Sequence, residues 1–225
     1  MNQIGPPWLS AGAIWSARLV LACVAVYVAI DISLVFLRPE FSVLHNAESD
    51  YGSRGPWAWL MDLNFVLRCV LSLLTVRAVL LASTSHAKGG RVRAGVVLVS
   101  VWAIASGLLA FFPDDPAGTA IHPAGRLHLA LAFVAFVAVL IGTPLISLAL
   151  SDQPVWKRVT VPMLAASFGA LVPLLLLVRT HFRITSLGGL YEKIFLAMEL
   201  LWMAIVTAPL GLHRADRADR PDRPR

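Results

Sequence analysis

The chain has 225 residues, of which 58% are apolar and only 14% are charged, and its formal net charge is +6. This composition excludes an ordinary soluble domain, because a soluble core does not need several charge-poor runs of about twenty residues, whereas a bilayer core ~30 Å thick requires them. The basic excess does not indicate nucleic-acid binding, since the basic residues are dispersed and form no base-reading module. We therefore predict an all-α, polytopic integral membrane protein.

Six charge-poor runs follow one another along the chain, and at 1.5 Å per residue each reaches ~28 Å or more. The first run is longer than the apolar core of a signal peptide and has no small-x-small cleavage pattern after it, so we expect it to be kept as a span. A six-transmembrane-helix bundle is predicted for residues 19–212, with spans at about 19–37, 57–76, 94–112, 127–150, 159–178 and 194–212.

The basic residues between the spans indicate the orientation. If both termini are cytoplasmic, the inner segments carry ten Arg and Lys residues and the outer segments six, which agrees with the positive-inside rule. Residues 1–18 would then form a short cytoplasmic N-terminus. Residues 213–225 repeat Arg-Ala-Asp, become proline-rich and lack apolar residues to bury, so we expect a disordered cytoplasmic tail.

Several polar residues are predicted at one depth inside the spans. Asp31, Asp62, Ser106 and Glu199 each lie five or six residues inside the predicted outer end of a span, which corresponds to ~8 to 9 Å below the outer boundary. A charged side chain that faces lipid costs several kcal/mol, so we expect these acids to face each other or a wet vestibule.

The second span also carries an arginine near the middle of the bilayer. At 100° per residue Asn64, Arg68, Ser72 and Thr75 fall on one face of the helix, which predicts a polar stripe against other helices. Arg68 needs a counter-ion, and a long arginine side chain could reach Asp31 or Glu199. A structural ion pair and a direct part in binding or transport both fit this position.

The predicted outer connections carry further titratable residues. Glu192 lies near the positive N-terminal end of the last helix. No HExxH or comparable metal signature is present, so we predict no cofactor and consider a divalent metal only on His45, Asp114 and His128. The remaining outer candidates for a pocket are Asp50, Arg126 and Arg183.

Four segments together resemble a known family. They are "FLRPEFSVLHNAESDYGSRGPWAWLMDLNF" in the first outer connection, "FFPDD" after the third span, "GRLHLA" at the fourth and "GGLYEKI" at the last. In this order they resemble the six-span prokaryotic family called domain of unknown function 998, over about residues 19–212.

The resemblance implies a six-helix bundle in a prokaryotic plasma membrane and a cluster of polar residues on one side, but no settled activity. The chain is also distantly similar to the eukaryotic Frag1, DRAM and Sfk1 group of six-span proteins. Where the family often has arginine after the acid that opens the last span, this chain has Lys193. The residues in the implied cluster are His45, Ser49, Asp50, Gly52, Asn64, Asp114, His128 and Glu192.

Two functional hypotheses place a ligand in an outward-facing polar pocket. In the first, the protein binds a membrane lipid by its headgroup, or a small polar ligand, and Arg68, Arg126 and Arg183 face an anionic group. In the second, a membrane-embedded hydrolase cleaves lipid with a metal-activated water, for which Asp50 would be the base.

Two other hypotheses need no such pocket. In a proton- or ion-coupled transporter Asp31, Asp62 and Glu199 would form the relay, although no internal repeat or pair of interrupted helices supports it. In a scaffold the polar residues would only lock the helices together. The sequence leaves any protein partner unknown.

Overall fold

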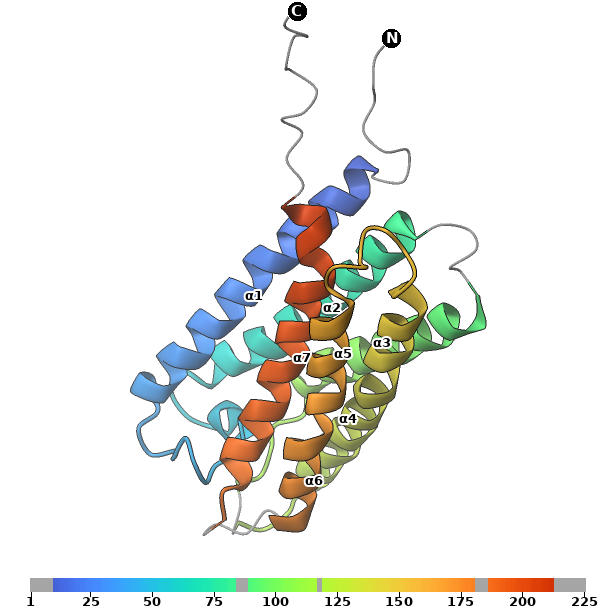
Figure 1. Ribbon diagram of the computed structural model, residues 1–225. Helices are drawn as coiled ribbons and strands as arrows, with labels where there is room; N and C mark the ends of the chain where they lie inside the picture. The colour runs from blue at the N-terminus through green and yellow to red at the C-terminus, as the bar shows by residue number, and fades with distance from the viewer. Residues whose placement is uncertain (1–9, 84–88, 117–118, 181–185, 213–225) are drawn as a thin grey trace, which may run out of the picture.

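The computed structural model describes residues 10–83, 89–116, 119–180 and 186–212, and the regular structure in these ranges is helical. Figure 1 shows the helices running side by side in a bundle. In chain order they are α1 (Ala11–Leu37), the short 3-10 helix η1 (Ser49–Gly52), α2 (Ala58–Ala82), α3 (Gly90–Leu109), α4 (Pro123–Leu150), α5 (Thr160–Gly169), α6 (Leu171–Thr180) and α7 (Gly188–Gly211).

Six helical segments among the described residues are long and apolar enough to cross a membrane, when α5 and α6 are taken together as one segment. Each corresponds to one predicted span. The all-helical fold with six candidate membrane spans is therefore confirmed, and the chain is an integral membrane protein by this criterion.

The first helix begins earlier than its sequence predicted. It starts at Ala11, where the Ser10 side chain accepts a hydrogen bond from the amide of Ala13 at 3.2 Å and so caps the helix. Part of the predicted N-terminal segment 1–18 is thus helical. Arg18 donates to the carbonyl of Gly211 at 3.1 Å, which ties the start of α1 to the end of α7. The predicted disordered tail, 213–225, lies outside the described residues.

The fifth span is divided into α5 and α6 at Ala170. Pro173 explains the interruption, because its ring nitrogen has no hydrogen to donate to the carbonyl of Gly169, four residues earlier. The backbone amide of Leu174 still reaches the carbonyl of Ala170 at 3.3 Å, so the break is local. Pro144 and Pro209, by contrast, lie inside the unbroken helices α4 and α7.

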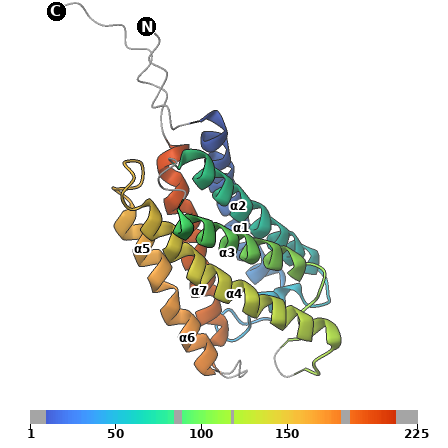
Figure 2. The same cartoon turned by 90° about the vertical axis from the view of Figure 1, so that its right-hand side faces the viewer.

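The packing of α4 leaves one side of the bundle open. α4 packs closely on α3, where Gly95 and Gly142 let the backbones approach: a Cβ atom on Gly95 would lie 2.9 Å from the carbonyl oxygen of Gly142. α4 also contacts α5, whereas α7 packs on α1, α5 and α6. Figure 2 shows α4 diverging from α6 away from the α5 end. This divergence gives the candidate site its position.

The connections 38–57 and 110–116 lie at the end of the bundle opposite the start of α1 and the end of α7 (Figure 1). We call this the distal end. Arg38 is buried there and donates from Nη1 to the carbonyls of Tyr51 and Ser53, both at 2.8 Å. These bonds fold the connection back onto the helices, so that its polar residues reach into the bundle.

Candidate functional site

The connection 38–57 docks on the N-terminal turn of α7. The amide of Leu190 donates to the carbonyl of Leu44 at 3.0 Å, and Lys193 donates from Nζ to the carbonyl of Asn46 at 2.7 Å. A Cβ atom on Gly189 would lie 2.0 Å from that same Asn46 oxygen, so only glycine allows the two backbones to approach this closely. The docking carries Glu48 and Asp50 into the bundle.

Among the residues that the structure describes, Glu48 is the counter-ion of Arg68. Arg68 Nη2 lies 2.5 Å from Glu48 Oε1, and both side chains are buried. Tyr27 of α1 completes the group, because its hydroxyl accepts from Arg68 and donates to Glu48. The prediction that Arg68 needs a partner inside the bundle is confirmed, but the expected partners, Asp31 and Glu199, are not those that it contacts.

The guanidinium of Arg68 is also enclosed by aromatic rings. Its Cζ lies 5.3 Å from the ring centroid of Tyr27 and 5.5 Å from those of Phe65 and Trp102. Ring faces attract a cation, and here they replace part of the water that the arginine loses on burial. Two other residues of the polar stripe predicted on α2 form hydrogen bonds inside the bundle. Ser72 accepts from the Trp102 indole at 3.1 Å, and Thr75 donates to a carbonyl of its own helix.

The predicted layer of acids does not form one cluster. Asp31 accepts from Asn64 Nδ2 at 2.7 Å, across the α1–α2 interface. Asp62 is half-buried and has no hydrogen-bond partner among the described residues. Glu199 is buried, and neither its carboxylate oxygens nor the hydroxyl of Ser106 has a described partner. No hydrogen bond or ion pair in the described part of the chain joins Asp31, Asp62 and Glu199 to one another.

A second polar group joins the connections to α4. Ser49 donates to Asp114 Oδ2 at 2.5 Å. His128 of α4 holds the carbonyl of Phe112 with Nδ1 at 2.7 Å and places Nε2 3.9 Å from the same oxygen of Asp114. His128 is 2% exposed. The connection after α3 is therefore fixed to both its neighbours.

A cavity of about 680 Å³ lies between these polar residues and the lipid-facing surface. Its polar part receives side chains from the connections, α2, α4 and α7, and its apolar part lies between α4 and α6. The polar lining consists of His45, Glu48, Ser49, Asp50, Arg68, Asp114, Asp115, Thr119, His128 and Glu192, and the apolar lining includes Phe65, Leu129, Phe133, Phe136, Val137, Leu140, Leu171, Leu174, Leu175 and Val178.

Glu192 differs from the other acids of this lining. Its side chain is 7% exposed, it lines the cavity, and no described residue gives its carboxylate a hydrogen bond or an ion pair. Asp50, in contrast, accepts from Asn46 Nδ2 at 2.8 Å and from the amide of Ala47 at 3.1 Å. Burial raises the pKa of the Asp50 carboxyl, and the Asn46 hydrogen bond opposes that rise.

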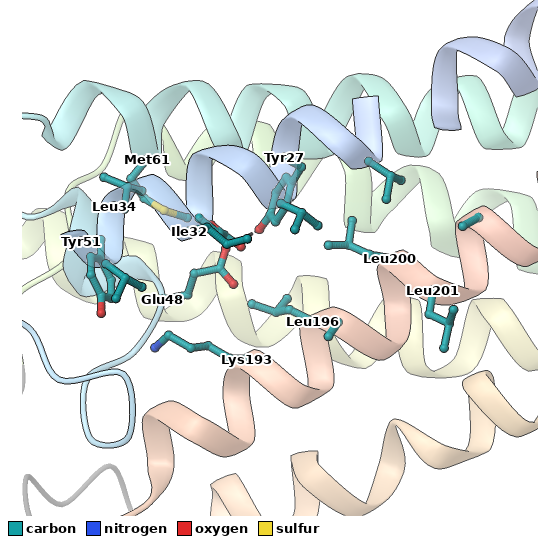
Figure 3. A pocket seen from close by; sticks show the side chains of 16 residues that line it. Tyr27, Ile32, Leu34, Glu48, Tyr51, Met61, Lys193, Leu196, Leu200 and Leu201 are labelled. Carbon is teal, nitrogen blue, oxygen red and sulfur yellow. Dashed lines mark hydrogen bonds between the residues drawn. The ribbon is translucent and has the colours of Figure 1, made fainter. Parts of the chain in front are cut away.

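A smaller cavity of about 390 Å³ lies in the groove between α1 and α7. Figure 3 shows Glu48 and Lys193 pointing toward this groove, with Tyr27 beside them and leucines of α7 along its length. Glu48 lines both cavities. The ion pair with Arg68 therefore stands between them, and Asp31 lines the smaller one only.

The other candidate residues do not converge on one site. His45 bonds through Nδ1 with the carbonyl of Ser186 at 2.8 Å and lines the large cavity from its exposed edge. Arg126 is exposed and lines neither cavity, and Arg183 lies outside the described residues. Over the described ranges no group of three His, Cys, Asp or Glu side chains is placed to hold a metal, so the set His45, Asp114 and His128 is not supported.

Asp115 has a local role at the start of α4. Its carboxylate accepts from the backbone amide of His122 at 2.6 Å and lies 2.9 Å from the Nδ1 atom of that histidine. These bonds hold the pKa of the Asp115 carboxyl below its usual range, the backbone bond being the larger cause. Asp115 therefore fixes the helix terminus beside the cavity.

Sequence reasoning missed two residues at the centre of the site, Tyr27 and Glu48. Tyr27 lies inside an apolar run of the first predicted span, where a tyrosine is easily taken for a packing residue. Glu48 lies within the segment that carries the family resemblance, but a loop residue has no predictable depth. The buried arginine was the available signal, because its counter-ion had to come from somewhere.

Residues 21–209 match the sequence profile of a family described as "Protein of unknown function (DUF998)". The chain belongs to this family. The match covers α2 to α6 in full, α1 from residue 21 onward and α7 up to residue 209, and it includes every described residue of the large cavity's polar lining. No curated protein and no solved structure matches the chain.

Proposed function

We propose that this DUF998 protein binds a membrane lipid in the large distal cavity, with the headgroup at the polar end and an acyl chain between α4 and α6. In this proposal the distal end faces outward, away from the cytoplasm of a prokaryotic cell. The protein need not be an enzyme to do this, because retention of a lipid requires only shape and charge.

The amphiphilic lining of the cavity is the observation that carries the proposal. Charged and polar side chains gather at one end, whereas the lining contributed by α4 and α6 is apolar. A ligand that fills both parts needs a polar group joined to a hydrocarbon chain, and a lipid has that construction. A small polar ligand would leave the apolar part without a partner.

The cavity is also open toward the region that lipid would occupy. Phe133 of α4 is 70% exposed, and Leu175 and Val178 of α6 are each 59% exposed, yet all three line the cavity. Because α4 contacts α6 little, a lipid could enter sideways between them without crossing the polar end. This route suits a ligand that arrives from the bilayer.

Two valines of α4 provide a matched test. Val137 lines the cavity and is 38% exposed, whereas Val134 lies outside it and is 48% exposed. Val137→Trp should fill the apolar part, so the protein purified in mild detergent should retain much less lipid by native mass spectrometry. Val134→Trp should retain lipid like the wild type.

Two results would contradict the proposal. If a folded Val137→Trp variant kept the same lipid in the same amount, the cavity would not be the binding site. If the wild type retained no lipid in mild detergent or in nanodiscs, the proposal would fail, and the polar network would be left with the scaffold function.

A further inference from the structure

We propose that the headgroup bound in the large cavity carries an ammonium group. This inference rests on the proposed function, and it names the chemical class of the ligand at that site. It differs from the anionic headgroup that the arginines of the sequence suggested. A zwitterionic lipid with a primary amine has the required chemistry.

The described polar lining has more acids than cations. Five acids, Glu48, Asp50, Asp114, Asp115 and Glu192, line the cavity together with one arginine, Arg68. Arg68 already forms an ion pair with Glu48 and a hydrogen bond with Tyr27, and aromatic rings cover its guanidinium. It therefore balances one carboxylate of the five and is not available to an anionic ligand.

The other cationic side chains near the large cavity, among the described residues, do not point into it. Lys193 donates to the carbonyl of Asn46 and lies 5.3 Å from the ring centroid of Tyr51, on the side of the smaller cavity. Arg126 is exposed and outside the cavity. An anionic headgroup at the polar end of the cavity would meet Asp50, Asp114 and Glu192, and such like-charge contacts would weaken its binding.

Glu192 is a buried acid at the polar end of the cavity, without a partner among the described residues. It is more than nine-tenths buried, it faces the cavity, and no described side chain or backbone amide satisfies its carboxylate. A buried polar group without a partner is costly, and a buried charge is costlier still. An ammonium group has three donors and a positive charge, so it would supply what Glu192 lacks and could also reach Asp114.

The test compares a zwitterionic lipid that carries an ammonium group with an anionic lipid that lacks one. Nanodiscs that contain equal amounts of phosphatidylethanolamine and phosphatidylglycerol would be offered to the full chain, and the retained lipid would be identified by native mass spectrometry. We expect retention of phosphatidylethanolamine to exceed that of phosphatidylglycerol by about tenfold, the effect of one charge-assisted hydrogen bond.

Three variants locate the origin of this preference. Glu192→Gln should reduce the preference for phosphatidylethanolamine toward equal retention of the two lipids. Asp152→Asn is the control, because Asp152 is an exposed acid between α4 and α5 that lines neither cavity, and it should keep the preference. If Glu192→Gln does not fold, Asp114→Asn removes another carboxylate at the polar end of the cavity.

The outcomes separate this inference from the proposed function. Equal retention of both lipids by the wild type, or an unchanged preference in folded Glu192→Gln and Asp114→Asn, would overturn the ammonium inference but leave lipid binding intact. Absence of any retained lipid would overturn the proposed function. If soluble ethanolamine displaced the lipid at equal concentration, the site would recognise a free amine. This result would overturn the inference that the ammonium group belongs to a lipid.

Discussion

At the scale of single residues, the charge pair of Arg68 and Glu48 determines how the distal end is built. The pair joins α2 to a loop, and Tyr27 connects it to α1. A buried arginine near the middle of a membrane span would be costly alone, so the loop must enter the bundle to supply the carboxylate. The ion pair and the loop fold therefore depend on each other.

Removal of one member of this pair should cost more than removal of both. Glu48→Leu leaves Arg68 buried without a counter-ion, and we expect a loss of about 3 to 5 kcal/mol in the free energy of unfolding. The double variant Glu48→Leu with Arg68→Met removes both charges and should recover a large part of that loss. Unfolding of the detergent-solubilised protein, followed by circular dichroism, measures both.

The double variant also tests whether the two charges interact in the folded protein. If the two substitutions destabilise additively, the charges do not interact in the folded protein, and the ion pair does not organise the distal end. The exposed residue Arg54 offers a control, because Arg54→Met removes a cation of the same connection without leaving a buried charge. It should change the free energy of unfolding by less than about 0.5 kcal/mol.

The need for a counter-ion could be predicted from the sequence, whereas its identity could not. Mid-span burial of Arg68 follows from hydropathy alone, and the expected stripe with Asn64 follows from helical periodicity. Depth along the spans predicts Asp31 or Glu199 as the partner, which assumes that only span residues reach that depth. Glu48 lies in a loop that folds inward, and the docking of a loop depends on packing that the sequence does not display.

At the scale of elements, the contact between the connection 38–57 and α7 holds the acids at the polar end of the large cavity in place. It brings two backbones together at Gly189 and Asn46, with a hydrogen bond from Leu190 to Leu44 beside them. The contact places Asp50, from the connection, and Glu192, from α7, in the lining of the same cavity.

Substitution of Gly189 should undock the connection. In Gly189→Ala the new Cβ atom would meet the backbone oxygen of Asn46 at 2.0 Å, and a backbone cannot withdraw as a side-chain tip does. We expect a loss of about 1 to 3 kcal/mol in stability and faster amide hydrogen exchange across residues 42–50. Gly90→Ala is the matched control, since nothing lies within 4 Å of a Cβ atom there. Equal exchange in both variants would show that the contact is not tight.

The stability of the connection between α3 and α4 should depend on pH through Asp115. Its pKa is held below the usual range by the backbone and side chain of His122, so its ionised form stabilises the folded state. This stability is fully present above the unfolded pKa of about 3.9 and is lost as pH falls through the lower folded value. In Asp115→Asn that part of the pH dependence should disappear. Thermal unfolding between neutral pH and about pH 3 measures it; an identical pH profile in the variant would contradict the assignment.

Element boundaries show where sequence patterns fail. The six runs were recognisable because hydrocarbon thickness sets their length. The early start of α1 at Ala11 depends on a cap by Ser10, which is a weak signal within a run of small residues. The break at Ala170 follows from Pro173, but Pro144 and Pro209 leave their helices intact. Whether a proline interrupts a helix depends on the packing around it.

At the scale of the whole molecule, the six helices form a bundle that differs between its two ends. The turn between α4 and α5 is short, whereas the distal end carries the long connections and the large cavity. Among the described residues, the polar side chains that line the large cavity lie at the distal end, so the orientation of this end in the membrane decides which compartment a bound ligand contacts.

We predict that the distal end faces outward. The Arg and Lys residues of the sequence favour the opposite end as cytoplasmic, by ten to six, and some distal basic residues are already paired, as Arg38 is with Glu40. The test uses single cysteines in a background with Cys23→Ala and Cys69→Ala, which removes both native thiols. Thr119 lies in the distal connection and Asp152 in the turn between α4 and α5, and both are exposed.

In intact cells a membrane-impermeant maleimide should label Thr119→Cys, whereas Asp152→Cys should react only after the cells are permeabilised. The reverse pattern would place the cavity on the cytoplasmic side, and labelling of both in intact cells would indicate insertion in two orientations. An outward cavity that opens sideways between α4 and α6 would draw its lipid from the outer leaflet, since α4 and α6 are apart at that depth. The labelling result therefore determines which leaflet must supply the lipid in the retention experiments.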